Sequence, residues 1–430
     1  MSDKKIPKIR FPEFTGDWEQ RKLSSMITDI ADGPFGSNLK TDHYTKEKEA
    51  RIIQLSNLSD YGWQEENIRY TTFEHAKEIK RCIVNEGELV MGKMMPAGMT
   101  IMRPNTEKMY VLSSDCVRIK LDNNIATDKF FLYTTKSDTF LNQVNNDSQG
   151  STRVRTSISK IREMEIAIPS VAEQEKIGEY FTNLDNLITL HQRKCEKIKE
   201  YKKGCLQKMF PKEGEAVPEV RFPEFTDAWE QRNLGDLIED KTILEQSDGN
   251  HGELYPRSEE FTEEGIPYIA ASSIAADGES IDFNLTKYLP IELAKQFRKG
   301  VAKNGDVLLA HNATVGPSVK LSMEYEFAVL STSLTLYRLD KERMNADFFL
   351  QAIRSNYFQN QLQVFMKQTT RSQVPILTQR NLDICFPKNI NEQIQVGRFL
   401  TNLDNLITLH QRECEKYKEL KKGLLQQMFV

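Results

Sequence analysis

Apolar residues recur at alternating spacings of four and three in two stretches of the chain, at positions 177–209 and 396–428. This alternation is typical of the a and d positions of a coiled coil, so it predicts two long helices. We call each row of positions a seam, and each covers about 48 Å at roughly 1.5 Å per residue. The first seam consists of Ile177, Phe181, Leu184, Ile188, His191, Cys195, Ile198, Lys202, Cys205 and Met209. The second consists of Val396, Leu400, Leu403, Ile407, His410, Cys414, Tyr417, Lys421, Leu424 and Met428.

Proline residues mark the ends of these helices. Pro169 and Pro387 precede the two seams and Pro211 follows the first, as expected for residues that begin or end helices. The first helix leads from one domain into the next, so the second can pack on it only by running back antiparallel. That arrangement predicts a pseudo-two-fold repeat with the C-terminus near the N-terminus.

The chain is a tandem duplication. Residues 10–21 read RFPEFTGDWEQR and residues 221–232 read RFPEFTDAWEQR, an offset of 211. Residues 182–210 and 401–429 match at 24 of 29 positions, with an offset of 219. The sequence therefore predicts a variable domain over 1–170, a helix over 171–210, a second variable domain over 211–389 and a second helix over 390–430.

The variable domains are predicted to mix α and β structure. Strand-like runs occur at 51–55, 88–91, 117–121, 268–271, 307–310 and 333–339, separated by Gly and Pro. Helical spacing occurs at 130–140 and 348–361. The predicted fold class is α+β, with two such domains joined by two long antiparallel coiled-coil helices.

Composition excludes several classes of protein. The chain is 39% hydrophobic and 28% charged, an ordinary globular balance. It has no apolar stretch of membrane-spanning length and no secretory signal, and its six Cys form no C-x-x-C pair. We therefore expect a cytoplasmic protein with free thiols, no membrane and no metal.

Motifs for catalysis are missing. GELVMGK at 87–93 begins like a phosphate loop, but Met94 stands where Ser or Thr is needed. The chain has no G-x-G for a dinucleotide and no Pro-Pro of the amino-methyltransferase signature. Cys195 lies one turn from His191, but both belong to the seam, where core packing is the simpler explanation. The sequence therefore predicts a binding protein without a catalytic site.

The two helices have stayed alike, while the variable domains have diverged. A seam constrains only its own positions, yet residues that we expect to be exposed match as well. Two copies of one partner, docked through the pseudo-two-fold, would account for the match, and recent duplication or recombination is the alternative. The candidate partner-contacting residues are Asn183, Asp185, Asn186, Gln192, Arg193, Asn402, Asp404, Asn405, Gln411 and Arg412.

This organisation resembles the specificity subunit of type I restriction–modification enzymes over the whole chain. The resemblance rests on RFPEFTGDWEQRKL and RFPEFTDAWEQRNL, which open the halves, and on GDVLL at 305–309. It also rests on IPSVAEQEKIGEYFTNLDNLI at 168–188 and FPKNINEQIQVGRFLTNLDNLI at 386–407. In both of these stretches a P-x(3,4)-E-Q step leads into a long helix, which is a specific signal.

The resemblance implies a division of labour. Two target-recognition domains would each read one half of a split sequence in double-stranded DNA, and the helices would set the gap between the halves. The helices would also carry two methyltransferase subunits, and restriction subunits would join the complex. S-adenosylmethionine, ATP and Mg²⁺ are then expected on those partners, and no cofactor on this chain.

Local charge and loop composition suggest where DNA is bound. Residues 69–162 hold 15 Lys and Arg against 10 Asp and Glu, and residues 287–380 hold 13 against 7, although the whole chain has a net charge of −4. Asn, Gln and Arg side chains can pair with base edges, and cations bind phosphate. Ordinary loop polarity is the alternative for each candidate. The candidates are Ser37, Asn38, Lys40, Lys93, Gln149, Ser151, Thr152, Arg153, Arg155, His311, Asn312, Thr314, Gln368, Thr369, Thr370 and Arg371.

The sequence thus favours a DNA specificity and scaffolding subunit. A tandem adaptor that binds two proteins or peptides is the second interpretation, and an autonomous enzyme is the third. Sequence-specific retention on DNA in the presence of the cognate methyltransferase separates the first two. Turnover by the chain alone would favour the third.

Overall fold

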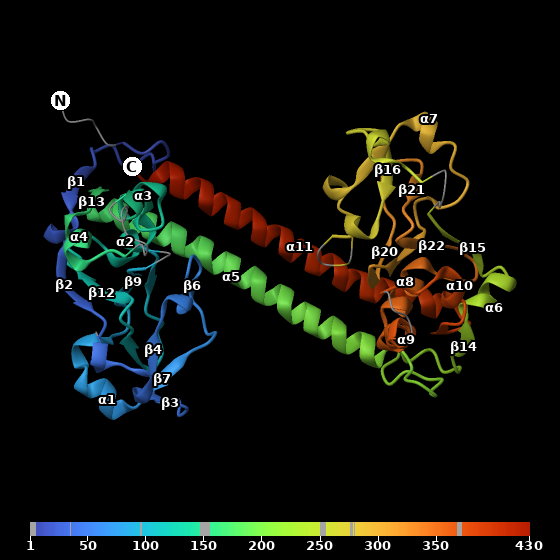
Figure 1. Ribbon diagram of the computed structural model, residues 1–430, viewed down its shortest axis with the longest axis horizontal. Coiled ribbons are helices and arrows are strands. Elements are labelled where there is room, and N and C mark those ends of the chain that lie inside the picture. The colour runs from blue at the N-terminus through green and yellow to red at the C-terminus, as the bar shows by residue number, and fades with distance from the viewer. Residues whose placement is uncertain are drawn as a thin grey trace. The chain divides into compact units, whose positions relative to one another are not determined.

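The computed structural model describes residues 6–34, 36–94, 97–146, 155–249, 255–275, 278, 280–367 and 372–430. The chain divides into two compact units, Met1–Gln192 with Arg412–Val430, and Arg193–Gln411. Two long helices, α5 (Val171–Lys208) and α11 (Ile390–Met428), each contribute to both units (Figure 1).

Within the described residues, unit 1 contains four sheets of two to five strands. Their orders are β10-β9-β12-β2, β3-β7-β4-β11-β8, β1-β13 and β5-β6. The strands are β1 (Glu19–Lys22), β2 (Ile27–Asp32), β3 (Tyr44–Thr45), β4 (Ala50–Ile53), β5 (Leu58–Ser59), β6 (Gly62–Trp63), β7 (Arg69–Thr71), β8 (Ile83–Val84), β9 (Leu89–Gly92), β10 (Thr100–Met102), β11 (Met109–Leu112), β12 (Cys116–Leu121) and β13 (Glu165–Ile168). The short helices are α1 (Phe73–Glu78), α2 (Asp128–Thr134), α3 (Asp138–Asn146) and α4 (Ile158–Glu163).

In the part of unit 2 that the structure describes there are three sheets, of orders β15-β22-β19-β20, β17-β16-β21-β18 and β14-β23. The strands are β14 (Glu230–Asn233), β15 (Ile243–Asp248), β16 (Ile266–Ile269), β17 (Lys287–Leu289), β18 (Val301–Ala302), β19 (Val307–Asn312), β20 (Thr314–Lys320), β21 (Ala328–Leu330), β22 (Leu334–Leu339) and β23 (Asp383–Phe386). The short helices are α6 (Leu234–Glu239), α7 (Ile291–Ala294), α8 (Ala346–Arg354), α9 (Asn356–Lys367) and α10 (Ile376–Gln379).

The two units share one strand order. The order β10-β9-β12-β2 returns as β20-β19-β22-β15, and β7-β4-β11-β8 returns as β17-β16-β21-β18. In each unit one pair of strands is parallel, β4 with β11 and β16 with β21. The duplication therefore extends to the variable domains, and the predicted α+β fold class with two repeated domains is confirmed.

The end of each long helix completes the core of a domain. In unit 1 the ring of Phe429 lies 5.6 Å from Phe130 and 5.7 Å from Phe181. In unit 2 the ring of Phe210 lies 5.6 Å from Phe348 and 5.7 Å from Trp229. Each domain core therefore contains buried side chains from both long helices or from a residue just after one of them, Phe181 and Phe429 in unit 1 and Leu400 and Phe210 in unit 2.

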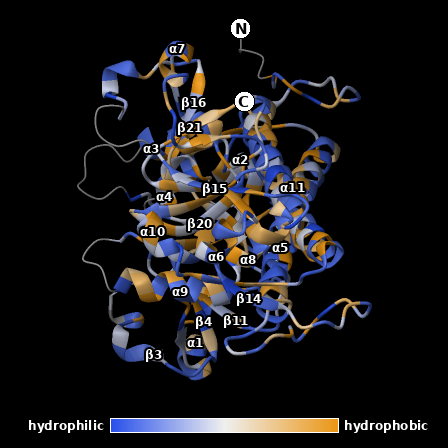
Figure 2. Ribbon diagram, turned by 90° about the vertical axis from the view of Figure 1, so that its right-hand side faces the viewer, coloured by the Kyte–Doolittle hydropathy of each residue, from blue (hydrophilic) through white to orange (hydrophobic). Residues whose placement is uncertain are grey.

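The predicted seams are buried. All twenty seam positions are buried or half-buried, including the polar His and Lys residues. Figure 2 shows both hydrophobic and hydrophilic colours along α11, as expected for a helix with one covered face. The helices run antiparallel in unit 1, because Phe181 contacts Phe429 while Asp185, further along α5, pairs with Lys421, earlier on α11.

A repeated contact joins the start of each half to the end of a long helix. In unit 1 the backbone N–H of Ile9 donates to the carbonyl of Gln427 at 3.1 Å. In unit 2 Val220 donates to Lys208 at 2.9 Å, and these residues are the equivalents of Ile9 and Gln427. The predicted closeness of the first half's start to the C-terminal helix is thus observed within unit 1.

Two predicted helices were wrong in their extent. The helical spacing at 130–140 belongs to α2 and α3, and that at 348–361 belongs to α8 and α9. Each break lies at a serine whose hydroxyl caps a new helix: Ser137 accepts from Phe140 N at 3.3 Å, and Ser355 accepts from Phe358 N at 3.4 Å. The predicted strands are present, with ends shifted by one or two residues.

Candidate DNA interface

Each domain has a tightly packed corner where its first long strand ends. A Cβ on Gly33, just after β2, would lie 1.7 Å from the carbonyl oxygen of Ser113. A Cβ on Gly249, just after β15, would lie 2.3 Å from that of Leu330. Only glycine permits this approach of the strand end to the turn that precedes β12 or β22.

Residues in or next to several predicted DNA-binding loops meet at these corners, as far as the structure describes them. In unit 1, Lys93 N donates to Asp115 O at 2.7 Å, Thr156 N donates to Lys93 O at 2.9 Å, and Arg155 bridges to Met94. We call residues 32–34, 93–94, 113–115 and 155–156 the first junction. Loops that are far apart in the sequence are therefore joined by backbone hydrogen bonds.

The same connections recur in unit 2. His311 N donates to Ser333 O at 3.0 Å, Val374 N donates to His311 O at 2.9 Å, and Ala313 N donates to Ser372 O at 3.0 Å. We call residues 248–249, 311–314, 331–333 and 372–374 the second junction. Ala313 has a φ of +65°, a strained value for alanine, at the tip between β19 and β20.

Some candidate side chains are accessible at or near the junctions. Asn38, Lys40 and Arg155 are exposed in unit 1, while Thr314 is exposed and Asn312 half-buried in unit 2. Nine other candidates lie outside the described residues, or have side chains that do: Ser37, Gln149, Ser151, Thr152, Arg153, Gln368, Thr369, Thr370 and Arg371.

Two of the predicted DNA-binding residues, Lys93 and His311, have buried side chains. The Lys93 side chain is only 2% exposed and pairs with the carboxylate of Asp32. His311 is 6% exposed, and its Nδ1 lies 3.2 Å from the carbonyl of Val374. Both side chains therefore brace a junction from inside and are not available to DNA.

A groove that was not predicted from the sequence lies beside the first junction. This groove of about 820 Å³ is lined by Asn38 together with His43, His75, Lys80 and Arg81. The two imidazoles stack with centroids 4.1 Å apart, and Nε2 of His75 lies 2.8 Å from the carbonyl of Asn38. Separation of these histidines by 32 positions left no local pattern from which the groove could be found.

Two predicted partner-contacting residues face inward instead. Asp185 pairs with Lys421 at 2.6 Å and accepts from the Tyr133 hydroxyl at 2.8 Å. Asp404 is buried, where it pairs with Lys202 and with Arg354 at 3.1 Å. Their match between the halves therefore reflects packing of α5 on α11, and it also explains the lysines in both seams.

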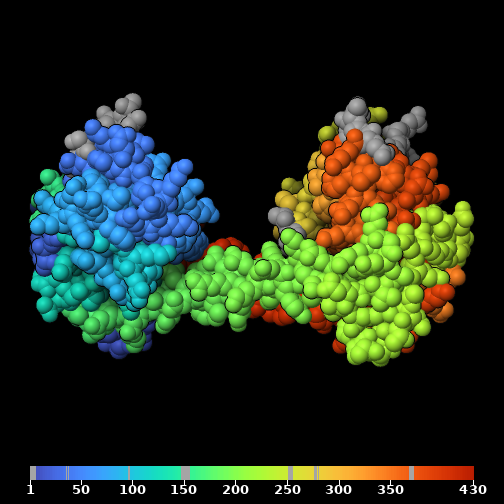
Figure 3. All heavy atoms as spheres, turned by 90° about the horizontal axis from the view of Figure 1, so that it is seen from below, coloured from blue at the N-terminus to red at the C-terminus, as the bar shows by residue number. Residues whose placement is uncertain are grey.

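The other helix candidates remain accessible. Asn183, Asn186, Arg193, Asn402, Asn405 and Arg412 are exposed, and Gln192 and Gln411 are half-buried. Large apolar residues at matched positions accompany them, namely Leu190 with Leu409 and Tyr201 with Leu420. Figure 3 shows that α5 (green) is uncovered on the face in view.

In each unit a cationic side chain links the domain to α11, Lys421 in unit 1 and Arg354 in unit 2. In unit 1, Lys136 Nζ donates to the carbonyl of Asp60 at 2.7 Å, and Lys421 lies 3.4 Å from the same oxygen. In unit 2, Arg354 stands at the position equivalent to Lys136. It pairs with Asp404 and donates to the carbonyl of Gly278 at 3.3 Å. Burial and, secondarily, the ammonium of Lys421 lower the pKa of Lys136 to about 8, although Asp185 and Asp60 act in the opposite direction.

We expect this lysine to make the stability of the chain depend on pH. The unfolded chain, with a lysine pKa near 10.5, binds more protons than the folded one between pH 8 and 10.5. The contribution of Lys136 to the free energy of unfolding should therefore rise with pH in that window, by roughly 1–3 kcal/mol. Urea unfolding of Lys136→Arg should lack this rise, because arginine does not titrate there. Parallel pH profiles for the wild type and the variant would contradict the assignment.

The repeated RFPEF segment is an anchor for the long helices. Nε and a terminal nitrogen of Arg10 donate to Glu173 at 2.7 Å each, and Arg221 makes the same contact with Glu392 at 2.7 and 2.8 Å. The next residue, Gln174 or Gln393, accepts from a backbone N–H before α2 or α8, at 2.9 Å in both units. The P-x(3,4)-E-Q step thus has a structural role, which the sequence alone did not reveal.

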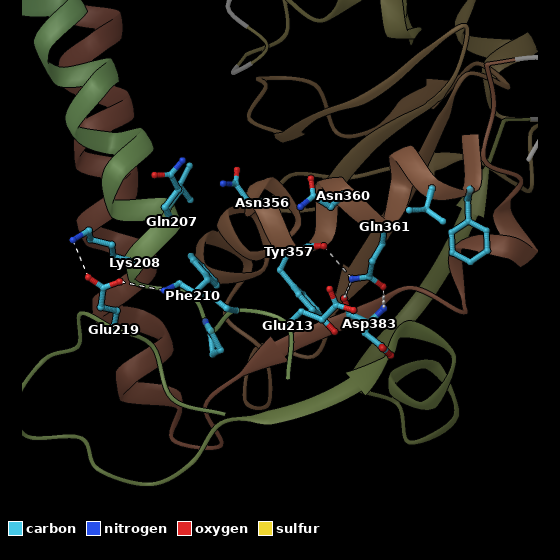
Figure 4. Close-up of a pocket in the computed structure, with 15 residues that line it drawn as sticks. Gln207, Lys208, Phe210, Glu213, Glu219, Asn356, Tyr357, Asn360, Gln361 and Asp383 are labelled. Carbon is cyan, nitrogen blue, oxygen red and sulfur yellow. Dashed lines mark hydrogen bonds and ion pairs between the residues drawn. The ribbon is translucent and has the colours of Figure 1, made fainter. Parts of the chain in front are cut away.

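The cavity in Figure 4 lies in unit 2, where α5 ends beside α9. It measures about 660 Å³, and its lining includes Tyr357, whose pKa is raised to about 12, chiefly by burial. Lys208 on its rim pairs with Glu219 at 2.8 Å. The Tyr357 phenol stays protonated at neutral pH, and the Lys208 ammonium is held in an ion pair with Glu219. These two groups therefore do not form an acid–base pair.

Metal binding and membrane spanning can be assessed for the described residues. Among them, no three His, Cys, Asp or Glu side chains are grouped to hold a metal ion. Within the same ranges, no helix combines the length and apolar character needed to cross a membrane.

Comparisons with known proteins agree on one family. A family model described as the type I restriction modification DNA specificity domain matches residues 16–200 and 226–419. The type I restriction enzyme MjaVIII specificity subunit of Methanocaldococcus jannaschii is 23% identical over 354 residues, which are 80% of this chain and 79% of that one.

Solved structures with the same fold were also found. The S subunit of a type I restriction–modification system from M. genitalium matches with a TM-score of 0.60 at 15% identity, over 99% of both chains. A chain from work on complex assembly and conformational transition of the type I R-M system matches with a TM-score of 0.50 at 14% identity. That second match covers 95% of this chain and 96% of the other.

Proposed function

Because the chain belongs to the type I restriction–modification DNA specificity family, we propose that it recognises a two-part sequence in double-stranded DNA. Each domain reads one half-site through its own junction. The observation that carries this proposal is that polar loops from distant parts of the sequence meet at one junction in each domain, beside sheets that share the order β10-β9-β12-β2 and β20-β19-β22-β15. Junctions of different composition on one framework suit two different half-sites.

The long helices carry two methyltransferase subunits, and restriction subunits join through the complex. Support comes from the accessible residues that match between the halves, with Leu190 and Leu409 offering apolar anchors. S-adenosylmethionine, ATP and Mg²⁺ are bound by those partners, so that this chain contributes recognition and no chemistry.

Exchange of one domain tests separable reading. Residues 24–165 are replaced by the corresponding segment of another family member, and the chain is expressed with its methyltransferase. Sequencing of methylated sites should show one half-site changed, with the other half-site and the gap retained. The reciprocal exchange of residues 235–383 is the matched control and should change only the other half-site. Changes in both half-sites after a single exchange would refute modular recognition.

Partner number is tested by paired surface variants. Leu190→Asp and Leu409→Asp change exposed side chains, so each should unfold like the wild type. Native mass spectrometry should show two methyltransferase subunits on the wild type and weaker binding of one of them in each variant. Saturation of the wild type at one subunit would contradict the scaffold.

A further inference from the structure

A basic pair recurs at matched positions in the two variable domains. Residues 76–82 read AKEIKRC and residues 294–300 read AKQFRKG, at an offset of 218. Lys80 and Arg81 in the first domain therefore correspond to Arg298 and Lys299 in the second. Both positive charges are present in both copies, although the order of Lys and Arg is reversed and the residues directly before and after the pair differ.

Burial follows the same order in both copies. Ala76 and Cys82 are buried in unit 1, where Ile79 is half-buried, and Ala294, Phe297 and Gly300 are buried in unit 2. Lys80, Arg81, Arg298 and Lys299 are all exposed. Each copy thus holds its backbone on buried residues and directs both cations to the surface.

The pair lies at the junction in each unit. In unit 1, the thiol of Cys82, next to Arg81, donates to the carbonyl of Asp32 at 3.5 Å. In unit 2, Gly300, next to Lys299, donates its N–H to the hydroxyl of Ser247 at 3.0 Å, and a Cβ there would lie 2.7 Å from the carbonyl of Asp248. The basic pair therefore lies beside the end of β2 in unit 1 and beside the end of β15 in unit 2, where each junction is formed.

In unit 1 the pair also lines the groove that contains Asn38. Lys80 and Arg81 share that groove with His43 and His75. The groove has two carboxylates, but Asp32 pairs with Lys93, and Glu78 lies 3.0 Å from Nδ1 of His75. Both acidic groups are thus engaged by other residues, which leaves the groove suited to an anion.

We propose that Lys80–Arg81 and Arg298–Lys299 are the phosphate-anchoring sites of the two domains. This inference rests on the proposed function and deepens it by assigning the contacts that fix each domain on the DNA backbone. Cationic side chains hold phosphates without regard to sequence, whereas groups such as Asn38 and Asn312 are suited to base edges. A retained pair of charges beside divergent loops matches this division.

Salt dependence of binding tests the proposal. The probe is a duplex carrying the methylated sequence, bound by the chain in complex with its methyltransferase subunits. Lys80→Ala with Arg81→Ala should lower the slope of log affinity against log salt by about two, and Arg298→Ala with Lys299→Ala should do the same. Affinity should fall by the same factor for cognate and unrelated duplexes, and the methylated sequence should stay the same.

Matched controls separate charge at the junction from charge elsewhere. Lys120 and Lys341 are exposed, and each lies toward the end of its sheet opposite the junction. Lys120→Ala with Lys341→Ala should leave the slope unchanged, and the exchange Lys80→Arg with Arg81→Lys should retain it. Unfolding in urea should be unaffected in every variant, because the altered side chains are exposed.

The outcomes distinguish this inference from the function on which it rests. An unchanged slope in both double variants overturns phosphate anchoring, whether or not the wild type prefers its sequence. If the slope is lower in the double variants but the wild type shows no preference for any sequence, anchoring is supported and the proposed recognition is overturned. A loss confined to the cognate duplex would assign these residues to base reading and overturn anchoring as well.

Discussion

Asp404→Asn should lower the free energy of unfolding by roughly 3–5 kcal/mol, because it leaves buried cations without their counter-charge. The carboxylate lies between Lys202 and Arg354, and it also accepts from Nε2 of Gln351 at 2.8 Å. The asparagine amide would bring donors toward two positive groups. Urea unfolding near pH 7 should show the loss as a lower midpoint.

The equivalent residue in unit 1 is the matched comparison. Asp185 pairs with Lys421, but its side chain is 22% exposed compared with 12% for Asp404, so water can replace part of the lost interaction. Asp185→Asn should therefore cost less than Asp404→Asn. Adding Lys202→Met to Asp404→Asn should restore part of the stability by removing an unpaired cation. Equal and negligible losses in both single variants would show that these pairs do not hold the helices together.

The long helices were predictable because their signal is local. A spacing of four and three needs only neighbouring residues on one helix, so the seams were found with their polar interruptions. The residues that pair with the seam lysines were not predictable from the sequence. Lys202 pairs with Asp404 and Lys421 with Asp185, and each pair is separated by more than 200 positions. Matching between the halves could not distinguish an outward-facing residue from an inward-facing one.

The variable domains were harder for the same reason. Single strands were located from composition, but the parallel pairing of β4 with β11 joins segments that are not neighbours in the sequence. Lys93 illustrates the consequence for the site. Its position on a loop after a strand made it a candidate DNA-binding residue, whereas its side chain pairs with Asp32, 61 residues earlier, at the end of β2 in the same sheet.

The contact between Arg221 and Glu392 should be the stronger of the two equivalent anchors. Glu392 is buried and accepts both bonds of the Arg221 guanidinium, and a third at 3.0 Å from the indole N–H of Trp229. In unit 1, Glu173 accepts two bonds from Arg10, and within the described residues the indole nitrogen of Trp18 has no hydrogen-bond partner. Both anchors tie the start of a half to the start of a long helix.

Glu392→Ala should therefore cost roughly 3–5 kcal/mol, since it leaves a mostly buried guanidinium unpaired. Glu173→Ala should cost about 1 kcal/mol less, the typical contribution of the additional hydrogen bond. Arg221→Lys should also be destabilising, because an ammonium cannot reproduce the two-pronged contact. A double-mutant cycle on Arg221 and Glu392, measured by urea unfolding, isolates the pair. A coupling energy near zero, or a greater loss from Glu173→Ala than from Glu392→Ala, would show that the repeated segment is held by its aromatic packing alone.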